Sequence, residues 1–483
     1  MQRRSTFGIS RAGVLLASAG LVFAACGGGT ATTQPAASTP ASSPAASTAP
    51  ASSAPSGSAA ASPSIPPASF DPSALAAAKT YAATLGSNIG GSVSVLAVWG
   101  DTEQAQFLGM LQPFEDATGI KVNYTGTRDE PAVLTAGIAS GQLPDVAGLP
   151  GPAQMIQYEQ AGKLQDLSTL LDVPTYTSQT PAALVKLGTT ADGKLSGVFL
   201  DVSAKGQIWY DPAVTGDLTT NPPKSWDDLT ALATTDKAKA QSPWCFSVES
   251  GAASGWAATD VLESFVLKSA GPDVYNSWWA GKTKWSDPAI KAAFQDLGTM
   301  VAGSYGGANR ILTTNFANAG DPLFTTPPGC LFLHQASFIT GLGAFATKTR
   351  LTDYNFFPFP AINAQYSGAV EGAGDLFGAF SNTPQTAALM KYLVSSQAQS
   401  LFVAGGEFLS ANKGVTNYPN PMNQSLGAIL SGATSFVFDA SDQMPAAMQT
   451  EFYKELLVYI QTPSQLDAVL ADLDSVQASS YNQ

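Results

Sequence analysis

Residues 27–69 consist almost entirely of Gly, Ala, Ser, Thr and Pro, with no charged residue and no hydrophobic periodicity. A segment of this composition cannot bury enough apolar surface to offset the conformational entropy lost on ordering. Its prolines add moderate stiffness, as in a spacer. We therefore interpret residues 26–69 as a disordered tether, which leaves the later residues to form the folded part.

The first residues have the order of a secretory signal. Basic residues precede an apolar run at residues 13–25, GVLLASAGLVFAA, which is too short to span a bilayer comfortably. The run ends in Ala-Ala and is followed by Cys26, a sequence that resembles the bacterial lipobox, although Phe23 stands where Leu is usual. The resemblance implies a lipoprotein signal peptide at residues 1–25 and a lipid on Cys26, so we expect an exported protein anchored to the outer face of the cell membrane. Ordinary cleavage after Ala25, beside an incidental cysteine, is the alternative.

Charge and residue usage exclude several classes of function. Lys and Arg number 23 against 36 Asp and Glu, a net charge of −13, so a nucleic-acid partner is not expected. The chain has one histidine, His334, and three cysteines, too few for the usual zinc sites or cysteine and serine catalytic centres. We predict no metal, no cofactor and no catalytic residue, and a binding protein rather than an enzyme.

Two cysteines remain once Cys26 carries lipid. Cys245 and Cys330 each lie beside a predicted strand, and the expected compartment is oxidising. We expect a disulfide between them. Two buried free thiols are the alternative.

The folded part begins with a predicted helix over residues 70–91, capped by Asp71. It is followed by a β-branched run at 92–100, by an apolar helical period that ends at Gly119, and by an alternating segment at 120–124. This strand, helix, strand order predicts an α/β lobe with a largely parallel sheet. Because no second low-complexity break interrupts the chain, we expect two lobes built from interwoven segments.

Six stretches occur in an order that resembles the family 1 extracellular solute-binding proteins, which include the maltose-binding proteins: VSVLAVWG, FEDATGIKV, LPDVAGL, GKLSGVFLDVSAKGQIWYDPAV, PPKSWDDLTALA and GKTKWSDPAIKAAF. The resemblance implies an α/β, two-lobe periplasmic-binding-protein-like fold whose hinge of crossing strands closes on a ligand. It places the first lobe at 92–203 and 335–381, and the second at 204–334 and 382–483. It also implies a monomer that delivers an oligosaccharide or α-glucoside-type sugar to the permease subunits of an ABC transporter.

A sugar site needs aromatic platforms and groups that form charge-assisted hydrogen bonds. Trp99 ends a predicted strand, and Asp101 and Glu103 follow at a helix start, where side chains face the carboxyl-end crevice of an α/β sheet. Arg128 and Asp129 lie in the next loop. The alternatives are a core role for the tryptophan, a helix cap for Asp101 and a solvated pair in the loop.

The second lobe offers a glycine- and serine-rich loop, WCFSVESGAASGWAATD. Glu249 and Trp256 put an acceptor and a platform on irregular backbone, where binding residues concentrate. Asp260 is interpreted as the cap of the following helix. Lys205 lies at the first expected lobe crossing and is predicted to face the cleft, with an exposed strand-end lysine as the alternative.

Three further carboxylates complete the predicted site. Glu371 and Asp375 lie among glycines in VEGAGDLFGAF, which resembles the family loop facing the cleft. Asp439 in FVFDASDQMP either caps a helix or reaches the ligand from its N-terminus.

Two other functions remain open at this stage. Negative charge and aromatic faces also suit a lipoprotein that binds a polyamine or another small solute. A secreted glycoside hydrolase would need only a pair of carboxylates such as Glu249 and Glu371, one of them with a raised pKa.

Overall fold

Helix α1 (Pro72–Thr84) is the first element of the computed structural model, which describes residues 68–481 except 417 and 419. The Asp71 side chain accepts hydrogen bonds from the backbone N–H groups of Ser73 and Ala74 and so caps the helix, as predicted. The predicted signal peptide, Cys26 and nearly all of the tether lie outside the described residues. None of the described helices combines the length and apolarity needed to cross a membrane.

The first lobe is built on a five-stranded sheet of order β2-β1-β3-β11-β4. Strand β1 pairs in parallel with β2 and β3, while β11 runs antiparallel between β3 and β4. The strands are β1 (Ser92–Ala97), β2 (Lys121–Gly126), β3 (Val146–Leu149), β4 (Val198–Phe199) and β11 (Leu376–Ala379). The intervening helices are α2 (Asp101–Thr118), α3 (Glu130–Ser140), α4 (Pro152–Gln160), α5 (Val173–Gln179) and α6 (Ala182–Leu187). The alternation of strand and helix is the predicted α/β pattern.

The second lobe has a four-stranded sheet of order β7-β8-β6-β9. Its strands are β6 (Gln207–Tyr210), β7 (Ser242–Cys245), β8 (Cys330–Gln335) and β9 (Asn355–Pro358). Its helices are α7 (Pro212–Thr215), α8 (Trp226–Thr235), α9 (Trp256–Trp279), α10 (Pro288–Ala302), α11 (Gly307–Thr313), α15 (Ala446–Gln461) and α16 (Leu466–Ser480). A disulfide joins Cys245 on β7 to Cys330 on β8, with Cα atoms 5.4 Å apart.

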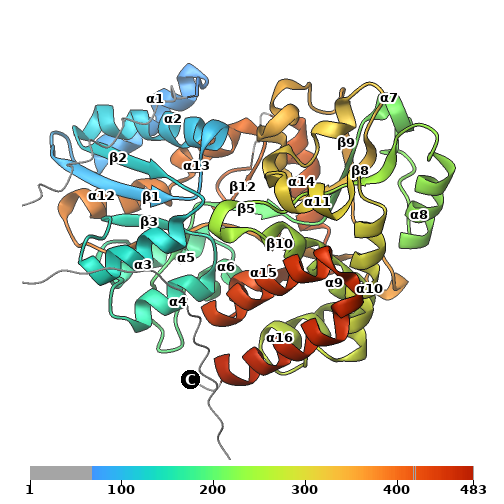
Figure 1. Cartoon of the computed structure of the whole chain (residues 1–483). Coiled ribbons are helices and arrows are strands. Elements are labelled where there is room, and N and C mark those ends of the chain that lie inside the picture. The colour runs from blue at the N-terminus through green and yellow to red at the C-terminus, as the bar shows by residue number, and fades with distance from the viewer. Residues whose placement is uncertain (1–67, 417, 419, 482–483) are drawn as a thin grey trace, which may run out of the picture. The chain divides into compact units, whose positions relative to one another are not determined.

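A third sheet, of order β12-β5-β10-β13, lies between the two lobes (Figure 1). It contains β5 (Asp201–Ala204), β10 (Ala369–Ala373), β12 (Leu409–Ser410) and β13 (Ser435–Phe438), with α14 (Pro421–Ser431) preceding β13. The chain leaves the first-lobe sheet at β4, runs through β5 and enters the second-lobe sheet at β6. It returns through β10 to β11, so β5 and β10 are the antiparallel crossing strands.

The structure corrects the predicted lobe boundaries. Helices α12 (Pro384–Leu393) and α13 (Ser396–Phe402) share a core with β1 and α2, so this part of 382–483 belongs to the first lobe. Strand β9 pairs with β6, so part of 335–381 belongs to the second lobe. The sequence indicates that an apolar helix face or a short strand is buried. It does not indicate which sheet the element packs against.

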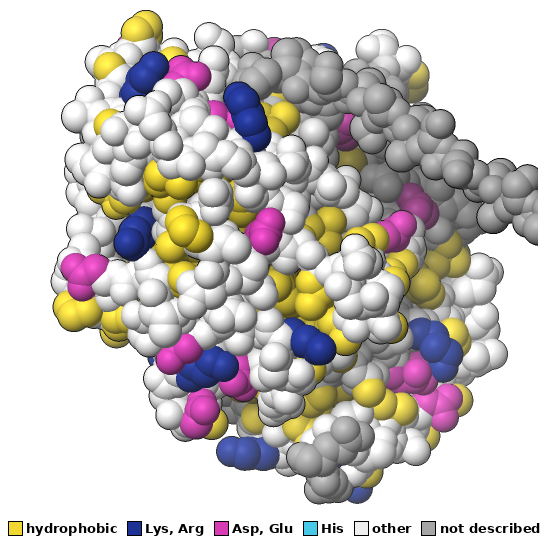
Figure 2. Space-filling model, turned by 90° about the vertical axis from the view of Figure 1, so that its left-hand side faces the viewer, with side chains coloured by type: hydrophobic (Ala, Val, Ile, Leu, Met, Phe, Trp, Pro, Cys, Tyr) yellow, Lys and Arg dark blue, Asp and Glu magenta, His cyan; other side chains and the backbone are white. Residues whose placement is uncertain are grey.

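Charged side chains are sparse on the folded surface. On the face drawn in Figure 2, positive and negative side chains lie in small mixed groups and singly among hydrophobic and uncharged ones. Inside the molecule, in contrast, several Asp and Glu side chains are buried near the crossing strands.

Candidate functional site

A cleft of about 700 Å³ lies between the two lobes. The first lobe contributes the end of β1, the first turn of α2, the loop before α3, and faces of α3 and α4. The second lobe contributes the loop before α9, the first turns of α9 and α15, and the short helix η9 (Ser441–Gln443). Residues on and beside β5 and β10 also line it, so the crossing strands border the cleft.

Most of the predicted site residues come together in this cleft. Those that line it are Trp99, Glu103, Arg128, Lys205, Trp256, Asp375 and Asp439. They come from both lobes and from the segments beside the strands that connect them. A ligand in the cleft could therefore contact both lobes and the connecting segments at once. The predicted residues absent from the lining are Asp101, Asp129, Glu249 and Glu371.

Lys205 is the centre of a buried charge network. Its Nζ lies 2.9 and 2.8 Å from the two carboxylate oxygens of Asp260 and 3.0 Å from Asp439 Oδ2. The same ammonium lies 5.3 Å from the centroid of the Trp256 ring, at the distance of a cation–π contact. The network thus holds a cation, two carboxylates and an aromatic ring in one wall of the cleft.

Burial and charge act in opposite directions on these groups. Burial alone would lower the pKa of Lys205, but Asp260 and Asp439 raise it well above the ordinary value of a lysine. Burial raises the pKa of Asp260 to about 7, even though the neighbouring Lys205 favours its charged form. Lys205 therefore stays charged at neutral pH, while Asp260 titrates near it.

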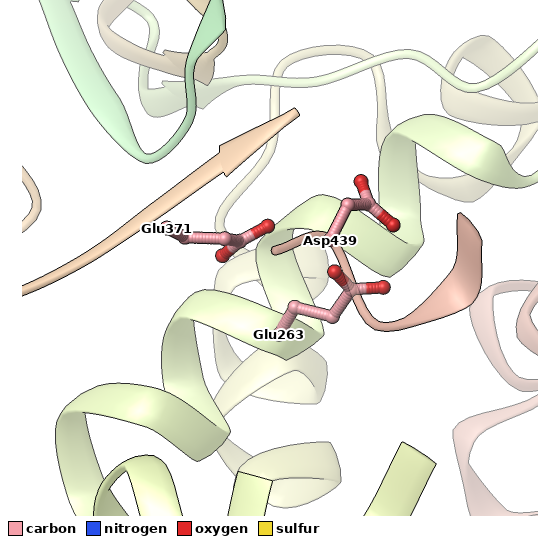
Figure 3. Close-up of side chains that lie close together, drawn as sticks. All are labelled: Glu263, Glu371 and Asp439. Carbon is pink, nitrogen blue, oxygen red and sulfur yellow. The ribbon is translucent and has the colours of Figure 1, made fainter. Parts of the chain in front are cut away.

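Three carboxylates form a second layer next to this network. Figure 3 shows Glu371 of β10, Glu263 of α9 and Asp439, which follows β13, converging so that oxygens from the three lie within 4.8 Å of one another. Glu263 accepts hydrogen bonds from the backbone N–H groups of Ala440 and Ser441. Burial raises the pKa of both Glu263 and Glu371 well above the usual range.

Carboxylate oxygens are the ligands of hard metal cations. Here the Lys205 ammonium already contacts Asp439, and backbone N–H groups already bond to Glu263. Hydrogen-bond donors thus occupy positions that a metal ion would need. We interpret the three carboxylates as support for the cleft wall.

Arg128 and Glu103 form an ion pair on the first-lobe side of the cleft. Burial raises the pKa of Glu103, and Arg128 opposes that effect. The Arg128 guanidinium also lies 5.1 Å from the centroid of Phe316, which belongs to the second-lobe helix η3 (Phe316–Asn318). Arg128 thus both lines the cleft and joins the lobes.

Asp375 lies just beyond β10, between the two lobes. Burial raises its pKa to about 7, and the nearby Glu103 adds to the rise. Hydrogen bonding from the Trp99 side chain favours the charged carboxylate but does not cancel the effect of burial. Asp375 can therefore change between an acceptor and a donor near neutral pH.

The two predicted tryptophans differ in exposure. Trp99 is only 1% exposed and packs against Phe402 and Phe107, with ring centroids 4.7 and 5.2 Å away. It is mainly a core residue whose edge reaches the cleft. Trp256 is partly exposed at the start of α9 and packs against Phe316 at 4.8 Å, which makes it the better stacking surface.

The four predicted residues outside the lining have other contacts. Asp101 is exposed at the start of α2. Asp129 is also exposed, and its Oδ1 accepts a hydrogen bond from Ala252 N, 3.1 Å away in the second lobe. Neither side chain is among those that line the cleft.

Glu249 holds the loop rather than facing the cleft. Its two carboxylate oxygens accept hydrogen bonds from Gly251 N and Asn315 Nδ2, each at 2.8 Å. Glu371 lies behind the lining, in the buried layer of Figure 3. Both predictions of direct ligand contact therefore need correction, because sequence position does not fix side-chain direction.

Sequence reasoning missed several lining residues. Asp260 is not a cap, because α9 begins at Trp256 and Asp260 faces the cleft from its second turn. Asp442 lies three positions after Asp439, a repeat of acidic residues that could have indicated it. Tyr158 and Tyr453 also line the cleft, and both lie within amphipathic helices. A tyrosine that faces a cleft has the same spacing from the apolar residues of its helix as one that faces the core, so the sequence does not distinguish the two.

Comparison with known proteins adds to this geometry. A family model described as bacterial extracellular solute-binding protein matches residues 100–400. The chain belongs to this family. The two-lobe α/β fold predicted from the resemblance is confirmed for this solute-binding protein by its structural neighbours.

Curated relatives of this solute-binding protein cover most of it. The osmoprotective compounds-binding protein GgtB of Synechocystis sp. is 32% identical over 374 residues, which are 76% of this chain and 88% of GgtB. The alpha-glucosides-binding periplasmic protein AglE of Rhizobium meliloti is 28% identical over 380 residues, 74% of this chain and 80% of AglE. Both relatives are named as binding proteins.

Solved structures share the fold at low sequence identity. The bacterial solute receptor AcbH has a TM-score of 0.70 and 18% identity, with 81% of this chain and 100% of that chain covered. A chitin oligosaccharide binding protein has a TM-score of 0.69 and 22% identity, with 82% and 100% covered.

Proposed function

We propose that this solute-binding protein captures an oligosaccharide or α-glucoside-type sugar outside the membrane and delivers it to the permease of an ABC importer. The observation that carries the proposal is the cleft between the lobes, which combines the Trp256 ring with the carboxylates of Asp260 and Asp375. Aromatic faces match the C–H faces of sugars, and carboxylates accept hydrogen bonds from hydroxyl groups. AglE, by its name, binds alpha-glucosides, which supports this class of ligand.

Hinge closure would couple binding to delivery. A ligand that contacts both lobes binds the closed form more tightly and shifts the population toward it. Strands β5 and β10 connect the lobes, and Lys205 and Asp375 lie directly beside them. Ligand contacts at these residues would therefore act on the hinge itself, and the closed form would be the one that the permease recognises.

The tether and its cysteine belong to the same proposal. A lipid on Cys26 would hold the monomeric protein at the outer face of the membrane, and residues 27–69 would let it move between solution and permease. Metabolic labelling with a radioactive fatty acid checks this part, because Cys26→Ser should abolish the label.

A polyamine or another small cation is the second candidate. Five carboxylates line the cleft, those of Glu103, Asp260, Asp375, Asp439 and Asp442, against the two cations Lys205 and Arg128. Lys205 is already paired with Asp260 and Asp439, and Arg128 with Glu103. An ammonium group would find acceptors there. The sugar remains our first proposal because the curated relatives with named ligands include a glucoside binder.

Thermal unfolding tests both candidates. Both lobes lie within the described residues 68–481, and the measurement uses the whole chain. A ligand at 1 mM with micromolar affinity adds about 4 kcal/mol to native stability, which shifts the melt clearly. We expect a shift with one class of sugar. A shift with spermidine alone would favour the cation, and sugar hydrolysis in the same samples would indicate an enzyme.

A further inference from the structure

A second pocket, of about 670 Å³, lies between the lobes. None of the described residues that line it also lines the cleft. The first lobe contributes part of α2 and the short helix η8 (Val403–Gly405), which follows α13, and α2 and α13 pack side by side (Figure 1). The second lobe contributes the short helix η6 (Gly343–Thr347) and residues 348–351. A pocket of this volume can hold a small molecule.

The pocket and the cleft differ in charge. Five carboxylates and two cations line the cleft. The charged residues in the described lining of the pocket are Lys348, Arg350 and Glu407, which are two cations and one carboxylate. In a chain whose net charge is −13, this is a local reversal of sign. A positive pocket of this kind attracts anions rather than cations.

Two further carboxylates lie on neighbouring loops but do not line the pocket. Asp211 Oδ1 accepts a hydrogen bond from Ala213 N, and Asp353 Oδ2 accepts one from Thr349 N, each at 2.7 Å. Both carboxylates therefore already hold a turn of the backbone. Their charges reduce the positive potential around Lys348 without forming an ion pair with it.

Both cations of the pocket have capacity left for a ligand. In the described part of the chain the Lys348 ammonium has no carboxylate partner, and it lies 5.2 Å from the centroid of the Phe324 ring. The Arg350 guanidinium pairs with Glu407. Because a guanidinium has five N–H donors, this pair leaves donors for the oxygens of an anion.

The first lobe offers uncharged donors on the other side of the pocket. Thr102 and Gln106 lie four residues apart on α2, so their side chains share the face of the helix that borders the pocket. Gln106 Oε1 has no hydrogen-bond partner among the described residues, and neither has its Nε2. An anion held by the two cations can therefore also accept a hydrogen bond from this amide, and would then contact both lobes.

We propose that this pocket is a second ligand site, which binds a small soluble organic anion carrying a carboxylate or phosphate group. Lys348 and Arg350 bind the anionic group, and Gln106 and Thr102 donate hydrogen bonds from the first lobe. The charge-assisted hydrogen bonds supply most of the affinity, because they are stronger than those between neutral groups. This site is separate from sugar binding in the cleft and does not depend on it.

Calorimetric titration of the whole chain with citrate and with glycerol 3-phosphate tests the proposal. Sodium chloride keeps the ionic strength constant, so general screening does not change during the titration. We expect saturable binding of one anion per chain. In Lys348→Gln the Kd should rise about tenfold, because a contact between opposite charges is lost. Lys186→Gln is the matched control and should bind normally, because Lys186 is exposed on α6 and lines neither the pocket nor the cleft.

A second pair of variants tests the place of binding while keeping both cations. Ala346 and Thr347 are adjacent and exposed, but only Ala346 lines the pocket. Ala346→Glu puts a carboxylate into the pocket and should abolish binding of the anion, whereas Thr347→Glu should bind it.

Three results would overturn the proposal: no binding of either anion, the same Kd in Lys348→Gln and Lys186→Gln, or equal binding by the two glutamate variants. None of these results would affect the proposed function, because the titrations contain no sugar.

Discussion

The Lys205 ammonium contacts both carboxylate oxygens of Asp260, at 2.9 and 2.8 Å, although the two residues are only 6% and 1% exposed. Lys205 follows the crossing strand β5, and Asp260 belongs to the second-lobe helix α9. The pair therefore fixes the hinge strand to one lobe while lining the cleft. Desolvation of the two charges offsets much of their attraction, so a buried ion pair of this kind adds little net free energy of folding. Its main effect is to hold the two side chains in a fixed position.

Asp260→Asn should weaken both the fold and the binding of ligand. Loss of one carboxylate leaves the buried Lys205 with Asp439 as its remaining close partner, which should lower the free energy of unfolding by about 3 kcal/mol. We expect Kd for the ligand to rise more than tenfold. Denaturant unfolding and calorimetry measure the two effects. Asp101→Asn, on an exposed residue outside the cleft, should change neither.

Stability should fall as the pH rises toward neutrality. The pKa of Asp375 is about 7 in the folded protein, against an ordinary value of 3.8, so the folded state binds more protons than the unfolded state between these values. The free energy of unfolding therefore decreases across that window, by at most about 1.4 kcal/mol per pH unit from this group. Urea unfolding from pH 4 to 8 measures the slope.

The variant Asp375→Asn separates this group from the other buried carboxylates. It should show a shallower decline in stability between pH 4 and 7 than the unaltered protein. An unchanged slope would mean that Asp375 keeps an ordinary pKa in the folded state.

Asp129→Ala should weaken ligand binding without removing a ligand contact. The Asp129 carboxylate accepts a hydrogen bond from Ala252 across the cleft, and such a bond contributes about 1 kcal/mol to the closed form. We expect Kd to rise about fivefold. Asp116→Ala removes the same charge from the exposed side of α2 and serves as the control. Equal affinities for the two variants would contradict a role for Asp129 in closure.

Loss of the disulfide should destabilise the second lobe and spare binding. Cys245 and Cys330 are 85 residues apart in sequence, and a cross-link over such a loop stabilises by about 4.6 kcal/mol in the chain-entropy model. The double variant Cys245→Ala and Cys330→Ala should therefore unfold at lower denaturant concentration, with ligand affinity unchanged. Thiol titration of the unfolded, unreduced protein should find neither cysteine reactive, and two reactive thiols would contradict the pairing.

The sequence was informative about elements and poor at side-chain direction. The end of β1 and the start of α2 were predictable, because a β-branched run and a helical period each have a clear spacing. Glu103 and Asp101 lie two residues apart on that helix, yet one lines the cleft and the other faces solvent. Only the rotation of the helix against its sheet decides between them.

Long-range packing was the other limit. Glu249 was a reasonable ligand candidate on a glycine-rich loop, but Asn315 approaches from a distant segment and takes one of its oxygens. The sequence position of Asp260 suits a helix cap, but α9 begins at Trp256, where no side-chain cap marks its start. Both outcomes depend on contacts between segments that are far apart in the chain.

The return of α12 and α13 to the first lobe affects how the chain can fold. Trp99 packs against Phe402 with ring centroids 4.7 Å apart, and Leu389 belongs to the same buried core. A chain that emerges N-terminus first, from the ribosome or across a membrane, cannot complete that core until Phe402 has emerged. The first half of the molecule should therefore remain open to chaperones and translocation machinery until most of the sequence has passed.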